Sequence, residues 1–163
     1  RVVVVGLSMG GAITLWLASR HSDLSGIVCI NPTTKSSASK LAGARLAVKT
    51  GKKSLPAIGS DISDPDVKES SYDATPLAAA VSLFADGLKP LSKKYGSIKV
   101  PLLLFTATND HVVNPKESDF LVSKYAGSVE RVTLERSFHV ATQDVEKETI
   151  HAKALEFAKR VTA

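Results

Sequence analysis

Hydrophobic positions along this chain fall into short runs that alternate between the pattern of a strand and the pattern of a helix. Four runs are continuous or have a period of two, which is typical of strands; they cover residues 2–5, 26–30, 102–110 and 129–135. Five other stretches carry helical spacing or helix start signals; they cover residues 9–20, 37–49, 77–88, 115–125 and 144–161. The alternation predicts an α/β fold with a parallel sheet and helices on both faces, and the valines at 2–5 predict a strand buried on both faces.

Residues 33–73 have a different character from the rest of the chain. Ser, Thr, Lys, Gly and Pro interrupt short apolar groups there, and a basic amphipathic helix at 37–49 is the one element that the pattern predicts. Thr75 and Pro76 then have the arrangement of an N-cap followed by proline at the first helical position, which predicts the start of the helix at 77–88.

Composition is that of a single globular domain, with 163 residues, 44% of them hydrophobic and 23% charged. No apolar run is long enough to span a bilayer and no signal peptide is visible, and the single cysteine, Cys29, lies in an apolar strand where a small core residue is expected. These features favour a cytoplasmic protein. The net charge of +5 comes without any nucleic-acid motif, so we expect no nucleic-acid partner.

A serine lies in the tightest part of the first strand-to-helix turn. Gly6, Ser8 and Gly10 fill the pattern G-x-S-x-G, in which glycine avoids a clash between the residues two before and two after the serine. A dinucleotide-binding fingerprint would need glycine at Ser8, and a P-loop would need Ser or Thr at Lys53. We interpret Ser8 as a nucleophile held in strained geometry, and an incidental serine in a glycine-rich turn is the simpler alternative.

A nucleophilic serine needs a base to accept its proton and an acid to orient that base. His139 follows a predicted strand in a loop, and Asp110 ends the strongest predicted strand, where a parallel sheet gathers its functional side chains. The other histidines have ordinary helix or loop positions: His21, His111 and His151. Ser8, Asp110 and His139 give the chain order Ser-Asp-His, which is the order of α/β-hydrolases and differs from that of chymotrypsin and subtilisin.

Three segments around these residues resemble bacterial carboxylesterases and monoacylglycerol lipases. The segments are GLSMGG at 6–11, LLLFTATNDHVV at 102–113 and SFHVATQD at 137–144, and YDATPL at 72–77 is also similar to that group. The resemblance implies a partial α/β-hydrolase fold, in which residues 1–163 are the C-terminal portion of one domain and residues 33–73 are a lid inserted in it.

The activity that this resemblance implies is serine carboxylester hydrolysis, on short- to medium-chain acyl esters or monoacylglycerols. Ser8 would attack the ester, His139 would act as base and then acid, Asp110 would orient His139, and the Met9 N–H would donate to the oxyanion. Neither a metal nor a cofactor is expected. A thioesterase or another hydrolase with the same triad is an alternative, and so is an inactive fragment.

One departure from the family concerns what lies before the serine. Family members have several strands there and a His-Gly loop that supplies a second oxyanion donor, whereas this chain begins with Arg1 directly before a strand. We therefore expect the chain to be a piece of a longer protein, poorly active by itself, because losing one oxyanion donor costs about 10²–10³ in turnover.

Apolar residues of the expected lid are candidates for an acyl pocket. Leu55 and Ile58 are the predicted substrate-binding residues, and packing of the lid onto the core is an equally good explanation for each. The lid also carries a set of basic residues that is a candidate contact with an anionic lipid surface, although a solvated face is the simpler interpretation; the set is Lys35, Lys40, Arg45, Lys49, Lys52 and Lys53.

Overall fold

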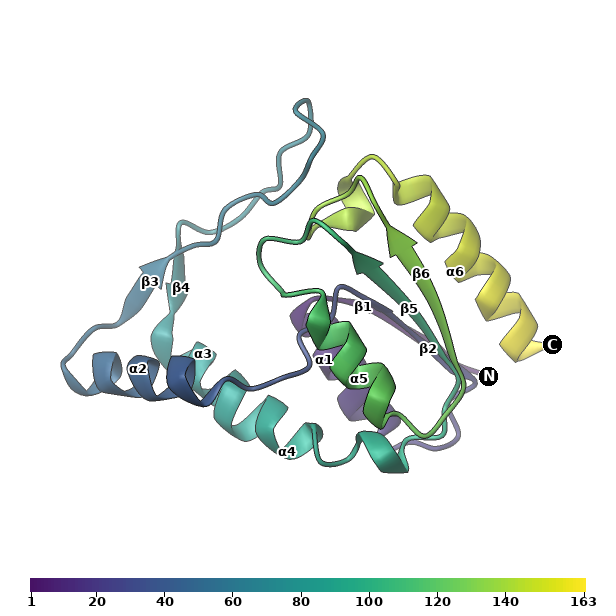
Figure 1. Cartoon of the computed structure of the whole chain (residues 1–163), viewed down its shortest axis with the longest axis horizontal. Coiled ribbons are helices and arrows are strands. Elements are labelled where there is room, and N and C mark those ends of the chain that lie inside the picture. The colour runs from purple at the N-terminus through teal and green to yellow at the C-terminus, as the bar shows by residue number, and fades with distance from the viewer.

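A four-stranded parallel sheet forms the centre of the computed structural model, which describes residues 1–163 apart from the side chain of Lys40. The strands stand in the order β1-β2-β5-β6, and every neighbouring pair is parallel (Figure 1). Their bounds are β1 Val3–Leu7, β2 Gly26–Ile30, β5 Leu102–Ala107 and β6 Val129–Leu134. The predicted α/β fold with a parallel sheet is thus confirmed.

Helices cover both faces of this sheet. α1 (Met9–Ala18) and α5 (Lys116–Lys124) lie on one face, and α6 (Lys147–Thr162) lies on the other (Figure 1). None of the helices among the described residues is long and apolar enough to cross a membrane.

The two central strands, β2 and β5, are buried along their whole length. Because successive strand residues point to opposite faces, each strand feeds two separate cores. Ile27 and Leu104 pack in the cluster that contains Leu15 of α1. Val28 and Phe105 pack in the cluster that contains Phe157 of α6. This double burial explains why these strands read as continuous apolar runs.

β1 is the edge strand and pairs with β2 alone among the described residues. Val3 and Val4 are half-buried, but Val2 and Val5 are 55% and 57% exposed. The apolar run at residues 2–5 has the pattern of a strand buried on both faces, but it is incompletely covered here, because the described residues supply no neighbour for the outer side of β1.

A small unit projects from the sheet at the side opposite α6 (Figure 1). It consists of α2 (Ala38–Lys49), the antiparallel pair β3 (Ser54–Pro56) and β4 (Ala74–Pro76), and the adjoining α3 (Leu77–Ser82). A long segment, residues 57–73, links β3 to β4 without a helix or strand of its own. The residues expected to form a lid, 33–73, thus contribute α2, β3 and the linking segment to this unit, and the strand pairing continues past residue 73 to Pro76.

The predicted N-cap at Thr75 is wrong. Thr75 pairs with Leu55 in the β3–β4 ladder, and Pro76 has extended backbone as the N-cap of α3. Pairing with a neighbouring strand satisfies the backbone at these positions, so the turn chemistry that the sequence suggested is not used.

The helix predicted at residues 77–88 exists but changes its winding. After α3 the chain continues through a π-helical turn, η1 (Leu83–Leu88), and a short α4 (Lys89–Leu91). The short 3₁₀ turns η2 (Tyr95–Ser97) and η3 (Ala141–Gln143) complete the described elements. π-helical turns are frequent at functional sites, and η1 contributes to the cavity described below.

Candidate active site

Ser8 lies between β1 and α1 in backbone geometry that a serine rarely adopts, with φ 54° and ψ −116°. The neighbouring strand and loop hold it there, because its N–H donates to the Ile30 carbonyl at 2.9 Å and its carbonyl accepts the Thr33 N–H at 3.3 Å. The hydroxyl makes no capping hydrogen bond to α1. The strained turn therefore has no helix-capping role for its side chain, which agrees with a nucleophile elbow.

The glycines around Ser8 have unequal roles. A Cβ at Gly6 would lie 2.2 Å from the Gly10 carbonyl oxygen, and one at Gly11 would lie 2.7 Å from Pro32 Cβ, so neither position accepts a side chain. A Cβ at Gly10 would meet nothing within 4 Å. The prediction that glycine is needed for room on both sides of the serine is therefore right for Gly6 and wrong for Gly10, because it is the Gly10 backbone that crowds Gly6.

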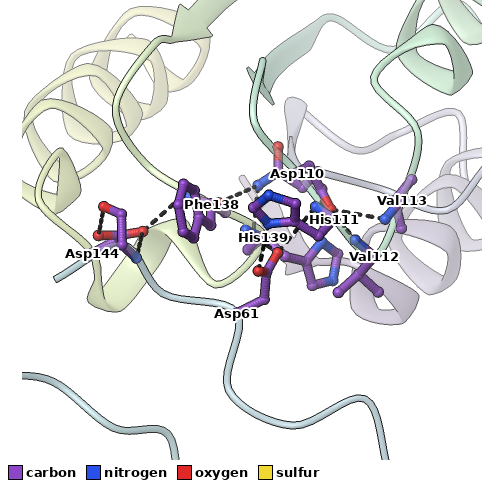
Figure 2. A network of polar contacts seen from close by, with 10 residues as sticks. Asp61, Asp110, His111, Val112, Val113, Phe138, His139 and Asp144 are labelled. Atoms are coloured by element: carbon purple, nitrogen blue, oxygen red, sulfur yellow. Dashed lines mark hydrogen bonds and ion pairs between the residues drawn. The ribbon is translucent and has the colours of Figure 1, made fainter. Parts of the chain in front are cut away.

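His139 and Asp110 form a buried pair. His139 Nδ1 lies 2.7 Å from Asp110 Oδ2, and the two side chains are 8% and 2% exposed. The other carboxylate oxygen of Asp110 accepts the N–H groups of Val112 and Val113, each at 2.8 Å (Figure 2). A carboxylate only accepts, so Nδ1 carries the proton and Nε2 is left with a lone pair.

The candidate residues come from loops at one edge of the sheet. Ser8 follows β1, Asp110 follows β5 and His139 follows β6, all at carboxyl ends of parallel strands. This edge is where a parallel α/β sheet places ligands and reactive groups. That reasoning predicted Asp110 and His139 from the sequence, whereas Ser8 was predicted from the G-x-S-x-G pattern, and the structure brings Asp110 and His139 into direct contact.

Met9 is the first residue of α1. The N–H groups of a helix's first turn have no partner within the helix and carry partial positive charge. Met9 also lines the same cavity as Ser8. The predicted role of its N–H toward an oxyanion is therefore chemically available.

Asn31 is a contact that sequence reasoning missed. It follows β2 with φ 44°, a left-handed conformation that Asn tolerates well. Its side-chain amide donates to the His139 carbonyl at 2.8 Å, and its side-chain oxygen accepts the Ala107 N–H at 2.7 Å. Asn31 thus ties the end of β5 to the loop that carries His139. A polar residue directly after a fully apolar strand was the signal that could have found it.

Asp61, in the long segment between β3 and β4, is a second missed contact. Its carboxylate lies 2.8 Å from His111 Nδ1 and accepts the backbone N–H groups of His111 and His139, each at 3.1 Å (Figure 2). The His111 ring also stands edge-on to Phe138, with 4.6 Å between ring centroids. Nothing in the sequence near Asp61 indicated these contacts, since 50 residues or more separate it from its partners.

Two further carboxylates accept hydrogen bonds from the loop around His139. Asp144 accepts the Phe138 N–H at 2.7 Å and the Ser63 hydroxyl at 2.6 Å, and Glu146 accepts the Ser137 N–H at 2.8 Å. Burial by itself would raise the pKa of each carboxyl, but these hydrogen bonds together hold the pKa of Asp144 and of Glu146 below the ordinary value. Both groups thus favour the charged form that orders this loop.

A cavity of about 520 Å³ opens beside Ser8. Its wall is largely apolar and comes from the projecting unit, from η1 and from the loop after Asp110; it includes Ser8, Met9, Ile58, Pro76, Ala79, Ala80, Leu83, Phe84, Val112 and Val113. Ile58 is therefore part of the wall. Leu55 lies on β3, is 41% exposed and is not part of the wall.

Other reactive groups have structural explanations. Cys29 is fully buried in β2, and burial raises the pKa of its thiol far above the usual range, which makes it a core residue and not a nucleophile. Among the described residues no group of three or more His, Cys, Asp or Glu side chains has an arrangement that could hold a metal ion.

Comparisons with known proteins show which family the chain belongs to. A family model described as serine aminopeptidase, S33, matches residues 1–146. The chain is 39% identical over 161 residues to a thermostable monoacylglycerol lipase of Bacillus sp. (strain H-257), which is 96% of this chain and 62% of that relative.

Solved structures show the same likeness. A structure from the work on LipS and LipT, two metagenome-derived lipolytic enzymes, has a TM-score of 0.89 and 34% identity, over 97% of this chain and 64% of that one. The monoacylglycerol lipase of Paleococcus ferrophilus has a TM-score of 0.73 and 22% identity, over 98% of this chain and 68% of that one. The chain thus spans less than two thirds of the Bacillus relative and of the metagenome-derived enzyme. Since the family model matches most of its residues, the chain belongs to the serine aminopeptidase S33 family of α/β-hydrolases.

Proposed function

We propose that the protein containing this chain hydrolyses carboxylic esters, as a carboxylesterase or monoacylglycerol lipase with Ser8 as nucleophile. The observation that carries the proposal is the buried 2.7 Å contact between His139 and Asp110, on loops of the sheet edge where Ser8 stands in its strained turn. The likeness to a named monoacylglycerol lipase and to lipolytic enzymes supports esters of acyl chains as the substrates.

In this mechanism Ser8 Oγ attacks the carbonyl carbon of the ester while His139 Nε2 takes the hydroxyl proton. The carbonyl oxygen becomes an oxyanion, and the Met9 N–H donates to it. The tetrahedral intermediate then collapses, His139 returns the proton to the departing alcohol, and Ser8 is left acylated. Water attacks the acyl-enzyme by the same route in reverse, which releases the acid.

Asp110 acts through His139. By accepting a hydrogen bond from Nδ1–H, its carboxylate keeps the lone pair on Nε2 and stabilises the imidazolium that forms during attack. The two backbone N–H groups on its other oxygen fix the carboxylate, so that it keeps its position as the imidazole changes charge.

The cavity beside Ser8 suits an acyl chain. A volume of about 520 Å³ with a largely apolar wall is in the range of small-molecule sites, and Ile58 and Phe84 present hydrocarbon to whatever occupies it. We infer that short- to medium-chain acyl groups or monoacylglycerols lie along this wall, with the ester carbonyl at Ser8. The same triad could also hydrolyse thioesters, by the same attack of Ser8 on the carbonyl carbon.

The family description raises aminopeptidase activity as a second candidate. An aminopeptidase needs an anionic group to hold the substrate's α-ammonium ion, and Glu117 is the carboxylate in the cavity wall. Its Oε2 already accepts the N–H groups of Thr34 and Lys35, at 2.8 and 3.1 Å. This commitment of Glu117 and the apolar wall favour esters over peptides.

The test is a substrate panel on the full-length protein, meaning the whole polypeptide in which this sequence occurs. We expect turnover of p-nitrophenyl esters and monoacylglycerols, less turnover of aminoacyl p-nitroanilides, and loss of activity in Ser8→Ala and His139→Ala. Turnover of anilides above that of esters would favour the aminopeptidase, and full activity in Ser8→Ala would overturn the proposal.

A further inference from the structure

Asp61 joins three parts of the molecule that are distant in sequence. It belongs to the segment at residues 57–73, yet its carboxylate receives the ring and backbone N–H of His111 and the backbone N–H of His139. His111 is the residue after Asp110. One side chain of the projecting unit therefore holds both loops that carry the proposed acid and base, as Figure 2 shows.

The backbone of Asp61 also contacts the loop that carries His139. The Val140 N–H donates to the Asp61 carbonyl at 3.0 Å. Two residues further along the same segment, the Ser63 N–H and hydroxyl donate to Asp144, at 2.9 and 2.6 Å. The backbone N–H groups of His139 and Val140 thus both end on Asp61.

The Asp61 carboxylate is mostly buried and hydrogen-bonded, unlike an ordinary surface charge. Its side chain is 14% exposed, whereas the ring of its partner His111 is 63% exposed. A carboxylate removed from water needs hydrogen-bond donors, and Asp61 has three on its two oxygens. Without that carboxylate, the backbone N–H of His139 would lose its acceptor. The same residue carries the imidazole whose direction the reaction depends on.

We propose that Asp61 is a positioning residue, through which the segment at 57–73 fixes the His139 loop for proton transfer. This inference rests on the proposed function. The imidazole must keep Nδ1 on Asp110 while it presents Nε2 to Ser8, and a displacement of about 1 Å in such an arrangement can cost about 10² in rate. Because Ile58 of the same segment lines the cavity, one stretch of chain both forms the substrate wall and aligns the base.

The test compares Asp61→Ala and Asp61→Asn with Asp66→Ala and Asp66→Asn in the full-length protein. Asp66 is an exposed carboxylate on the same segment and serves as the matched control. The measurements are kcat and KM for a p-nitrophenyl ester, with kcat expressed per active site counted by complete fluorophosphonate labelling. This normalisation removes any effect of misfolded enzyme.

We expect Asp61→Ala to lower kcat by about 10- to 100-fold with KM changed by less than about twofold, because alignment and not binding is lost. Asp61→Asn keeps one acceptor oxygen and should recover part of kcat, and both Asp66 variants should stay near wild type. If Asp61→Ala does not fold, the comparison of Asp61→Asn with Asp66→Asn tests the positioning role instead.

Equal kcat in the Asp61 and Asp66 variants overturns the positioning role. Ser8→Ala and His139→Ala run alongside, and activity surviving in these two overturns the proposed function instead.

Discussion

Replacing Asp110 with Asn tests the orientation of His139 with almost no change of shape. One carboxylate oxygen accepts the two N–H groups of Val112 and Val113, and the other accepts His139 Nδ1–H. In Asp110→Asn the amide oxygen must face the two backbone donors, because an NH₂ group there would meet N–H with N–H. The amide NH₂ then points at Nδ1, which can only accept from it, so the imidazole proton moves to Nε2.

A protonated Nε2 cannot take the proton of Ser8. The expected loss is about 10⁴ in kcat, which corresponds to about 5 kcal/mol of barrier. The assay is ester turnover by full-length Asp110→Asn against Asp119→Asn, a surface carboxylate paired with Arg131, with circular dichroism to establish that both fold. A loss below about tenfold in folded Asp110→Asn would refute the reasoning, because the tautomer would then not matter.

Three further predictions concern the cavity wall, the loop that carries His139 and the turn that carries Ser8. Ile58→Ala should shift the preferred acyl-chain length, by about 1–3 kcal/mol in relative kcat/KM, and Leu55→Ala should shift it less; equal chain-length profiles in both would deny that the wall contacts substrate. Asp144→Asn should lower the free energy of unfolding by about 1–3 kcal/mol at pH 7, measured in urea. Since the pKa of Asp144 is depressed in the folded state, that difference should persist above the unfolded pKa near 3.9 and vanish as pH falls through the lower folded value, whereas a pH-independent difference would contradict the role of its charge. Gly6→Ala should lower the free energy of unfolding by about 3 kcal/mol or more and Gly10→Ala far less, as thermal unfolding would show, because a Cβ would meet the backbone at Gly6 and nothing at Gly10.

Local patterns in the sequence predicted the elements of the sheet well. β2 occupies the predicted residues 26–30, and β5 and β6 lie within their predicted ranges. These strands are buried on one or both faces. Their buried positions are occupied by apolar residues, which form the pattern that the prediction uses. The projecting unit was harder, because its short strands pair only with each other and their residues are mostly exposed.

The candidate site divides along the same line. Ser8 could be found from the G-x-S-x-G pattern, and Asp110 and His139 because each follows an identifiable strand and strand ends converge in a parallel sheet. Asn31 also stands directly after a strand, β2, but its contacts could not be foreseen from that position, and Asp61 follows no strand of the sheet. Apart from the His111 ring, their partners are backbone groups of distant loops, at separations of 50 residues or more, and a backbone N–H or carbonyl leaves no mark in the sequence.

Covalent labelling tests the central claim, that Ser8 is the nucleophile, most directly. Full-length protein is treated with a fluorophosphonate probe, digested, and the modified peptide is identified by mass spectrometry. The account predicts one adduct per chain on Ser8, no adduct in Ser8→Ala, and much slower labelling in His139→Ala, because the base activates the hydroxyl. An adduct on another residue, or undiminished labelling of Ser8→Ala, would contradict it.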